Sequence, residues 1–167
     1  MMSPVSHVIR PVDPDDLDVL LEINQVNVPE VGSVDREKLA FLVDESVIAL
    51  VVAVDDAIAG FCVVLGPGST YDSGNYRWFM DRDPSVLYLD RVAFDPELQG
   101  RGLGSALYRR VFEEMAERFP SAPELALEVN VDPPNEPSLA FHERLGFAEV
   151  GRRTSHGLEV SLMSRPV

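Results

Sequence analysis

The sequence predicts a mixed α+β (mixed α/β) domain built on one mixed β-sheet, and three observations support that fold class. The 167 residues are enough for one domain with a sizeable hydrophobic core, which we expect to span residues 1–167. Segments with the two-residue period of strands alternate with segments of helical period. Their order is strand, two helices, hairpin, strand, helix, strand, helix, hairpin, which is typical of helices packed on a mixed sheet.

The first half of the chain is expected to form an edge strand, two helices and a central hairpin. The strand at 8–12 contains a proline, which a sheet accepts only at its edges and strand ends. An Asp-Pro-Asp-Asp run opens the helix at 13–24, and a serine or aspartate opens a second helix within 33–43. Residues 47–54 and 57–65 are apolar on both faces, so we expect two strands inside the sheet, covered by helices.

The second half is expected to begin with a long loop and to end with a hairpin. The loop at 69–84 is dense in aromatic and hydrogen-bonding side chains, which is typical either of a binding wall or of a cover over the core. The remaining elements are a strand at 87–94, a helix at 103–119, a strand at 125–131, a helix at 136–145 and a hairpin of strands at 147–152 and 158–163.

Charge and composition limit the partners of the chain. A formal net charge of −14 argues against nucleic acid and against an anionic membrane surface, and it weakly favours a cationic acceptor. The N-terminal residues lack the apolar core of a signal peptide, so a cytoplasmic protein is expected. Cys62 lies in an apolar run, which predicts a buried side chain. His7 and His156 have no third ligand at metal-binding spacing, so no metal site is expected.

The strand at 87–94 interrupts its own alternation. Strict alternation would place Arg91 on an apolar face with Leu87, Leu89 and Ala93. A β-bulge near residues 90–92 would restore the pattern and leave a backbone N–H unpaired. An ordinary strand in which Arg91 extends its charged group to the sheet edge explains the same residues equally well.

A glycine-rich turn at 99–104 stands at the start of the longest helix. Backbone N–H groups at such a helix start can hold a phosphate. No Gly-Lys-Ser/Thr follows, which excludes a P-loop, and the dinucleotide-binding fingerprint fits poorly because the required βαβ unit is missing. The remaining form is Gln-x-x-Gly-x-Gly, followed by a helix with an apolar stripe of Leu103, Leu107, Val111, Met115 and Phe119.

With this motif the chain resembles the GCN5-related N-acetyltransferases, the GNAT superfamily. Their signature, Q/R-x-x-G-x-G/A after the fourth strand, matches residues 99–104 at every specified position, and a second family segment matches residues 135–147. The words NVPEVG, NYRWF, EVN and PPN are similar to a bacterial subgroup of predicted acetyltransferases with no assigned substrate. The resemblance implies a central, mostly antiparallel sheet of about seven strands, about four flanking helices, and strands four and five splayed around the cofactor; dimers are common in the superfamily.

The cofactor that the resemblance implies is acetyl-CoA (coenzyme A). Its pyrophosphate would rest on the N–H groups of the glycine-rich turn, aided by the helix dipole. Its pantetheine arm would pair with the strand at 92–94, where a bulge N–H would polarise the thioester carbonyl, so the resemblance favours the bulge. The residues it assigns to the cofactor are Val92, Ala93, Phe94, Gln99, Gly100, Arg101, Gly102, Leu103, Gly104, Ser105, Asn135, Ser138 and Phe141.

The implied reaction is direct attack of a neutral primary amine on the thioester. An alkyl ammonium titrates near ~10, so the enzyme has to remove a proton. Asp90 and Glu128 are the candidate bases, and for each the alternative is a structural ion pair. Tyr88 shares a strand face with Asp90, and Asn130 shares one with Glu128, so these four polar side chains form one candidate catalytic cluster.

His142 stands where much of the superfamily has a tyrosine that protonates the leaving thiolate. It is either that acid or a packing residue beside the cofactor, in which case Tyr88, Tyr76 or water would donate the proton. Candidate contacts to the acceptor are Asn27, Tyr76, Trp78 and Asn130.

Two functions follow from the resemblance. The first is an acetyl-CoA-dependent N-acetyltransferase whose acceptor is a small metabolite, an amino acid or a peptide N-terminus. The second is a sensor or regulatory module that binds CoA or acyl-CoA without turnover. The carboxylates near the expected thioester favour the enzyme, because a pure binder has no need of them.

Overall fold

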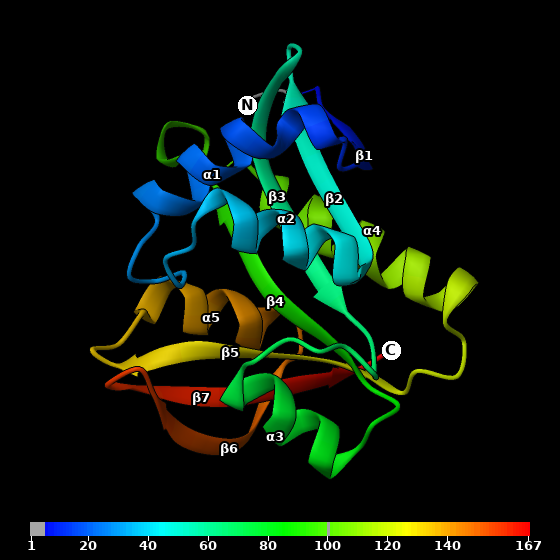
Figure 1. Ribbon diagram of the computed structural model, residues 1–167, viewed down its shortest axis with the longest axis vertical. Coiled ribbons are helices and arrows are strands. Elements are labelled where there is room, and N and C mark those ends of the chain that lie inside the picture. The colour runs from blue at the N-terminus through cyan, green and yellow to red at the C-terminus, as the bar shows by residue number, and fades with distance from the viewer. Residues whose placement is uncertain (1–5, 100) are drawn as a thin grey trace.

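The computed structural model describes residues 6–99 and 101–167, and its strands form one seven-stranded sheet (Figure 1). The strand order is β1-β2-β3-β4-β5-β7-β6. Among the described residues, β4 and β5 run parallel and the other neighbouring pairs run antiparallel, as predicted. The bounds are β1 (Val8–Pro11), β2 (Ser46–Val54), β3 (Ala57–Leu65), β4 (Leu87–Phe94), β5 (Glu124–Asp132), β6 (Ala148–Ser155) and β7 (Leu158–Pro166).

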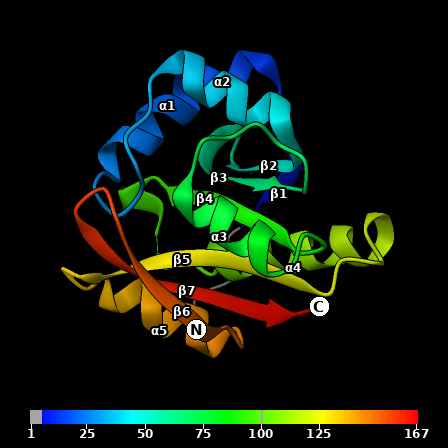
Figure 2. The ribbon, with the colours of Figure 1, turned by 60° about the horizontal axis from the view of Figure 1, so that its bottom comes forward.

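Helices cover both faces of this sheet (Figure 2). One face carries α1 (Leu17–Val26), α2 (Arg36–Glu45) and α3 (Gly74–Arg82), and the other carries α4 (Leu103–Arg118) and α5 (Glu136–Arg144). Leu103, Leu107, Val111 and Met115 of the apolar stripe predicted for α4 are buried, together with Tyr108, whereas Phe119 follows the helix and is half-buried. None of the helices in the described part of the chain has the length and apolar character needed to cross a membrane.

The helix α3 corrects the prediction of a loop over residues 69–84. The Ser73 hydroxyl accepts a hydrogen bond from the N–H of Tyr76, which caps the helix start. Tyr76 and Phe79, three residues apart, are buried on one face of the helix. Glycine and asparagine in its first two positions have low helix propensity, so the sequence favoured a loop where this short helix forms.

The same helix removes two residues from the predicted acceptor site. The Tyr76 hydroxyl donates to the carbonyl of Gly66 at 2.6 Å, inside the core. Trp78 packs against Gly151 and Phe79. Neither side chain is among the described residues that line the cavity presented below, so the structure does not bring Tyr76 and Trp78 to that cavity.

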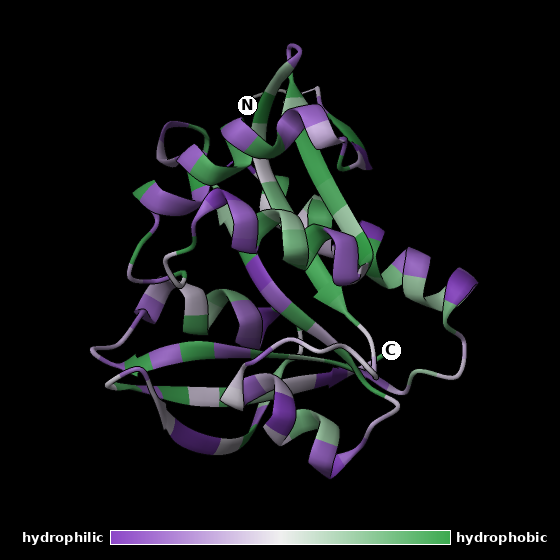
Figure 3. Cartoon of the chain, in the orientation of Figure 1, coloured by the Kyte–Doolittle hydropathy of each residue, from purple (hydrophilic) through white to green (hydrophobic). Residues whose placement is uncertain are grey.

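A β-bulge at Asp90 is confirmed, and it opens the sheet. Val63 of β3 pairs with Arg91 while Val64 pairs with Leu89, so Asp90 is the extra residue on β4. A hydrophilic stretch is visible in the middle of β4, among largely hydrophobic strands (Figure 3). β4 pairs with β5 only at its first two residues, Leu87 and Tyr88, and then diverges from it. The predicted splay of strands four and five is therefore present.

Cys62 is fully buried in β3, as its apolar surroundings predict. Burial raises the pKa of its thiol to about 12, so the reactive thiolate is scarce at neutral pH. We expect the folded protein to give no colour with a disulfide thiol reagent and to give one equivalent after unfolding in guanidinium. Immediate reaction of the folded protein would contradict this burial.

Candidate active site

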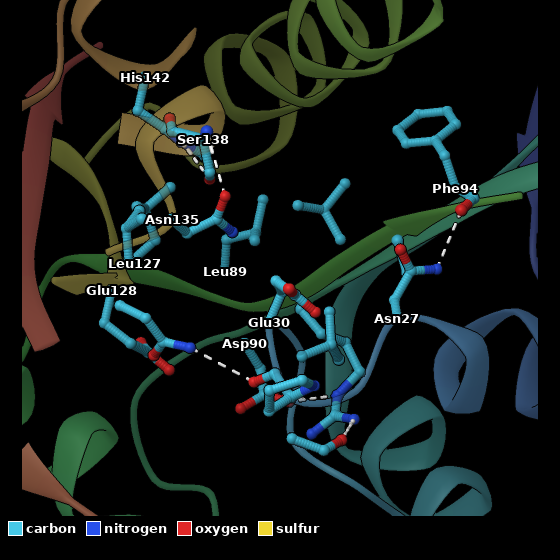
Figure 4. Close-up of a pocket in the computed structure, with 18 of the residues that line it drawn as sticks. Asn27, Glu30, Leu89, Asp90, Phe94, Leu127, Glu128, Asn135, Ser138 and His142 are labelled. Atoms are coloured by element: carbon cyan, nitrogen blue, oxygen red, sulfur yellow. Dashed lines mark hydrogen bonds and ion pairs between the residues drawn. The ribbon is translucent and has the colours of Figure 1, made fainter. Parts of the chain in front are cut away.

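A cavity of about 1330 Å³ opens where β4 and β5 separate. Its walls come from the loop after α1, the bulged half of β4, the start of α4, β5, α5 and the β6–β7 turn (Figure 4). This volume exceeds the ~300–1,000 Å³ of ordinary small-molecule pockets. The cavity therefore has room for a long cofactor and a second substrate.

The glycine-rich turn lies at one end of this cavity. Gly102 is the N-cap of α4 with a φ of 76°, a conformation that favours glycine, and an added Cβ there would meet no atom within 4 Å. Gly102, Leu103, Gly104 and Ser105 line the cavity together with Gln99, so the first N–H groups of α4 lie beside it. Arg101 is exposed and is not among the described lining residues, and Gly100 lies outside the described part of the chain.

The bulged half of β4 forms a second wall. Val92, Ala93 and Phe94, which are predicted to bind the cofactor, line the cavity, and past Tyr88 no residue of β5 pairs with this edge among the described residues. Asn27 also lines the cavity, but its amide nitrogen donates to the carbonyl of Phe94 at 2.9 Å and to that of Ile23 at 2.7 Å. Asn27 therefore ties α1 to β4, and both of its donor hydrogens are used.

The wall formed by α5 contains Asn135, Ser138, Phe141 and His142. The Asn135 side chain caps this helix by accepting from the N–H of Ser138 at 3.4 Å. Figure 4 shows Asn135, Ser138 and His142 on the same side of the cavity. The predicted helix and its cap are thus confirmed, and they bring the predicted cofactor residues together.

His142 has both ring nitrogens engaged. Its Nδ1 lies 2.7 Å from the Ser138 carbonyl, which can only accept, so Nδ1 carries the proton. Its Nε2 lies 2.6 Å from the Tyr108 hydroxyl and, in the neutral ring, accepts that hydrogen. Burial lowers the pKa of His142, which keeps it neutral. This geometry argues against His142 as the acid and favours the packing role. Tyr108 also lines the cavity, and the sequence did not indicate it because its position on the apolar face of α4 is typical of a core residue.

Asp90 is committed to an ion pair with its neighbour. Its carboxylate lies 2.8 Å from Nε of Arg91, and only 3% of the Asp90 side chain is exposed. Arg91 also donates to Asn24 Oδ1 at 2.8 Å and to the Gly32 carbonyl at 3.0 Å. Asp90 also lines the cavity, and this geometry favours the structural ion pair, which was the alternative to a role as a base.

Glu128 is the carboxyl group whose surroundings suit proton transfer. It is half-buried on β5, lines the cavity and accepts a hydrogen bond from the Tyr88 hydroxyl. Desolvation and the nearby Asp90 raise the pKa of Glu128 to about 7, although hydrogen bonds from Tyr88 and Asn75 oppose the rise. A carboxyl with this pKa exchanges protons readily at neutral pH.

Tyr88 and Asn130 complete the predicted cluster in different ways. Tyr88 is fully buried behind Glu128, and burial raises its pKa well above the ordinary value, so it supports the carboxyl and is a poor acid. Asn130 lines the cavity and donates to the Pro29 carbonyl at 3.3 Å, which joins β5 to the loop after α1.

Comparison with known proteins identifies the family. The model of the acetyltransferase (GNAT) family matches residues 17–147. The chain belongs to the GNAT family. This match confirms the GNAT resemblance that the sequence motifs indicate.

Solved structures share this GNAT fold over nearly the whole chain. The ribosomal-protein-S18-alanine N-acetyltransferase from Escherichia coli aligns with a TM-score of 0.76 at 22% identity, covering 97% of this chain and 94% of that one. Ard1 from Thermoplasma volcanium aligns with a TM-score of 0.78 at 21% identity, covering 98% and 99%. The yncA protein from Salmonella typhimurium, solved with its cofactor acetyl-CoA, aligns with a TM-score of 0.71 at 19% identity, covering 96% and 94%.

A curated relative is similar over a shorter stretch. Mycothiol acetyltransferase from Mycobacterium sp. (strain JLS) is 31% identical over 72 residues, which are 43% of this chain and 24% of that protein. The matched stretch is thus about a quarter of the length of that relative.

Proposed function

We propose that the chain is an acetyl-CoA-dependent N-acetyltransferase that transfers an acetyl group to a primary amine by direct attack. The observation that most supports this is the position of Glu128, a carboxyl with a pKa of about 7 in the cavity between splayed strands. A module that only binds CoA gains nothing from a carboxyl poised to exchange protons there.

The described residues fit acetyl-CoA. The first turn of α4 offers N–H groups and an open, positive-φ glycine for a pyrophosphate. The unpaired edge of β4 at residues 92–94 offers backbone groups to an extended arm. Acetyl-CoA supplies the acetyl group as an activated thioester, and the side chains of Asn135, Ser138 and Phe141 border the same space.

Within this proposal Glu128 is the general base. The Tyr88 hydrogen bond holds its carboxyl in place on the cavity wall. The carboxylate accepts the proton that the amine has to lose before or during attack. Asp90 holds Arg91 and keeps the bulge rigid, so it acts on the geometry of β4 and takes no proton.

An acceptor screen tests the proposal. Peptides with free N-termini, amino acids and polyamines are incubated with the protein and acetyl-CoA, CoA release is recorded, and acetylated amines are identified by mass spectrometry. We expect thiol release that depends on the amine, with an equal amount of acetylated product. Binding of acetyl-CoA without any amine-dependent release across the panel would contradict the enzyme and favour the sensor.

Gly104→Val is expected to weaken acetyl-CoA binding by roughly tenfold or more. A Cβ on Gly104 would already lie 3.3 Å from the ring of Phe141 and 3.9 Å from that of Phe94, so the larger valine side chain would displace these two cavity-lining rings. The measurement is the rise in melting temperature with acetyl-CoA, since a ligand at ~100 times its Kd stabilises by about 2.7 kcal/mol.

Ala106→Val is the matched control, because it lies on the same helix and is not among the described cavity-lining residues. It should show the wild-type ligand response. An unchanged response in Gly104→Val would place the cofactor elsewhere.

A further inference from the structure

Two side chains from outside β4 and β5 approach Glu128. Asn75, at the start of α3, is 6% exposed and lines the cavity. Arg153, on β6, donates from Nη1 to Asn75 Oδ1 at 2.7 Å. Both belong to elements that the proposed reaction has not yet used.

The contact with Arg153 fixes which way the Asn75 amide faces. A guanidinium can only donate, so Oδ1 of Asn75 has to face Arg153 and Nδ2 has to face the opposite way. On that side Nδ2 lies 3.5 Å from the Ser155 hydroxyl. Asn75 and Glu128 line the same cavity, and Asn75 is close enough to act as a donor that lowers the pKa of Glu128. The donor end of the amide is therefore the end that is available to the Glu128 carboxyl group.

The start of α3 is shaped for this contact. A Cβ on Gly74 would lie 2.4 Å from Nη2 and 2.6 Å from Nη1 of Arg153. The absence of a side chain at Gly74 therefore gives the guanidinium its place beside Asn75.

We propose that Asn75 is a positioning residue that stabilises the carboxylate form of Glu128, and that Arg153 fixes the amide orientation this requires. The inference rests on the proposed role of Glu128 and deepens it. The three residues come from α3, β6 and β5, so the fold brings a donor from before β5, and the arginine from after it that orients this donor, to one proton-transfer group.

Other polar groups lie around Glu128, and the test has to leave them in place. Those that act on Glu128 come from β4 and from the segment before α3, and they are Tyr88, Asp90, Arg91 and Tyr71. Ser155, at the end of β6, and His156, in the β6–β7 turn, line the same cavity. Of these, Asp90 acts to raise the pKa of Glu128, while Tyr88 and Arg91 act to lower it. A change at Asn75 or Arg153 leaves all six side chains present.

The experiment follows the protonation of Glu128 directly and through turnover. Side-chain carboxyl carbons of glutamate are labelled with carbon-13, the Glu128 signal is assigned with Glu128→Gln, and its pKa is read by NMR titration. In Asn75→Ala we expect that pKa to rise by about one unit, because a donor to the charged form is lost. The apparent pKa of the acid limb in the plot of kcat against pH should rise by the same amount.

Arg153→Met is the second variant and should shift the pKa in the same direction by less, since the amide is then free to turn. Arg152→Met is the matched control: Arg152 is the next residue on β6, pairs with exposed Glu149 at 2.7 Å, and should leave the pKa unchanged. A lower rate at every pH with an unshifted Glu128 titration would overturn the inference. NMR measures the pKa of Glu128 without turnover. An active Glu128→Gln variant would therefore refute Glu128 as the base, while the titration would still show whether Asn75 stabilises its carboxylate form.

Discussion

Glu128→Gln is expected to lower kcat for acetyl transfer by roughly 10²–10⁴-fold and to leave acetyl-CoA affinity unchanged. Glutamine keeps the shape of the side chain and can still accept from Tyr88, but it cannot take a proton. The measurement is amine-dependent CoA release at saturating substrates, with the melting shift by acetyl-CoA as the binding readout.

Stability distinguishes lost chemistry from lost folding in this variant. The folded pKa of Glu128 lies above its unfolded value of about 4.5, so the group stabilises the fold at low pH and that contribution disappears as pH rises through about 7. At pH 8 the wild type keeps a desolvated carboxylate, so Glu128→Gln should be at least as stable.

Glu124→Gln, on the same strand but not among the described cavity residues, is the matched control and should retain full activity. A fully active Glu128→Gln would refute the base.

Arg91→Met is expected to destabilise the protein by about 3–5 kcal/mol. Removing Arg91 leaves the buried Asp90 carboxylate without its cationic partner and takes the Arg91 donor away from Asn24 Oδ1, while the Gly32 carbonyl still accepts from Asn24 Nδ2. At roughly 2–4 °C per kcal/mol for a chain of this size, the melting temperature should fall by about 10 °C.

The double variant Asp90→Asn/Arg91→Met tests the cause of that loss. It removes both charges, so it should recover part of the stability lost in Arg91→Met. If the double variant is less stable than Arg91→Met by the full cost of a second substitution, the pair does not act as a unit and the ion-pair account of the bulge is wrong.

Much of the fold was predictable because its patterns are local. The hairpin of β2 and β3 joins two apolar runs through Asp55 and Asp56, both with positive φ, and the cap at Asn135 and the stripe of α4 are likewise set by nearby residues. Arg91 interrupts the alternation of its strand, which fits a bulge and an arginine at the sheet edge equally well, and the family resemblance favoured the bulge that the structure contains. The helix α3 was missed because its glycine and asparagine start outweighs a short apolar face.

The candidate site was predictable only as a set of residues. The sequence indicated Asp90 and Glu128 equally as candidate bases. The structure distinguishes them, because Asp90 is paired with Arg91, whereas Glu128 is desolvated and has a raised pKa. Asn75 and Arg153 lie 78 positions apart, and no local pattern relates them. The same holds for His142, whose role depends on Tyr108, 34 positions away on another helix.

The pH dependence of kcat at saturating amine and acetyl-CoA tests the central claim most directly. If Glu128 deprotonates the amine in the cavity between β4 and β5, kcat should fall tenfold per pH unit below an apparent pKa of about 7. Glu128→Gln should lack that limb. A limb near 7 that persists in Glu128→Gln, or a wild-type kcat that is flat down to pH 5, would contradict the account.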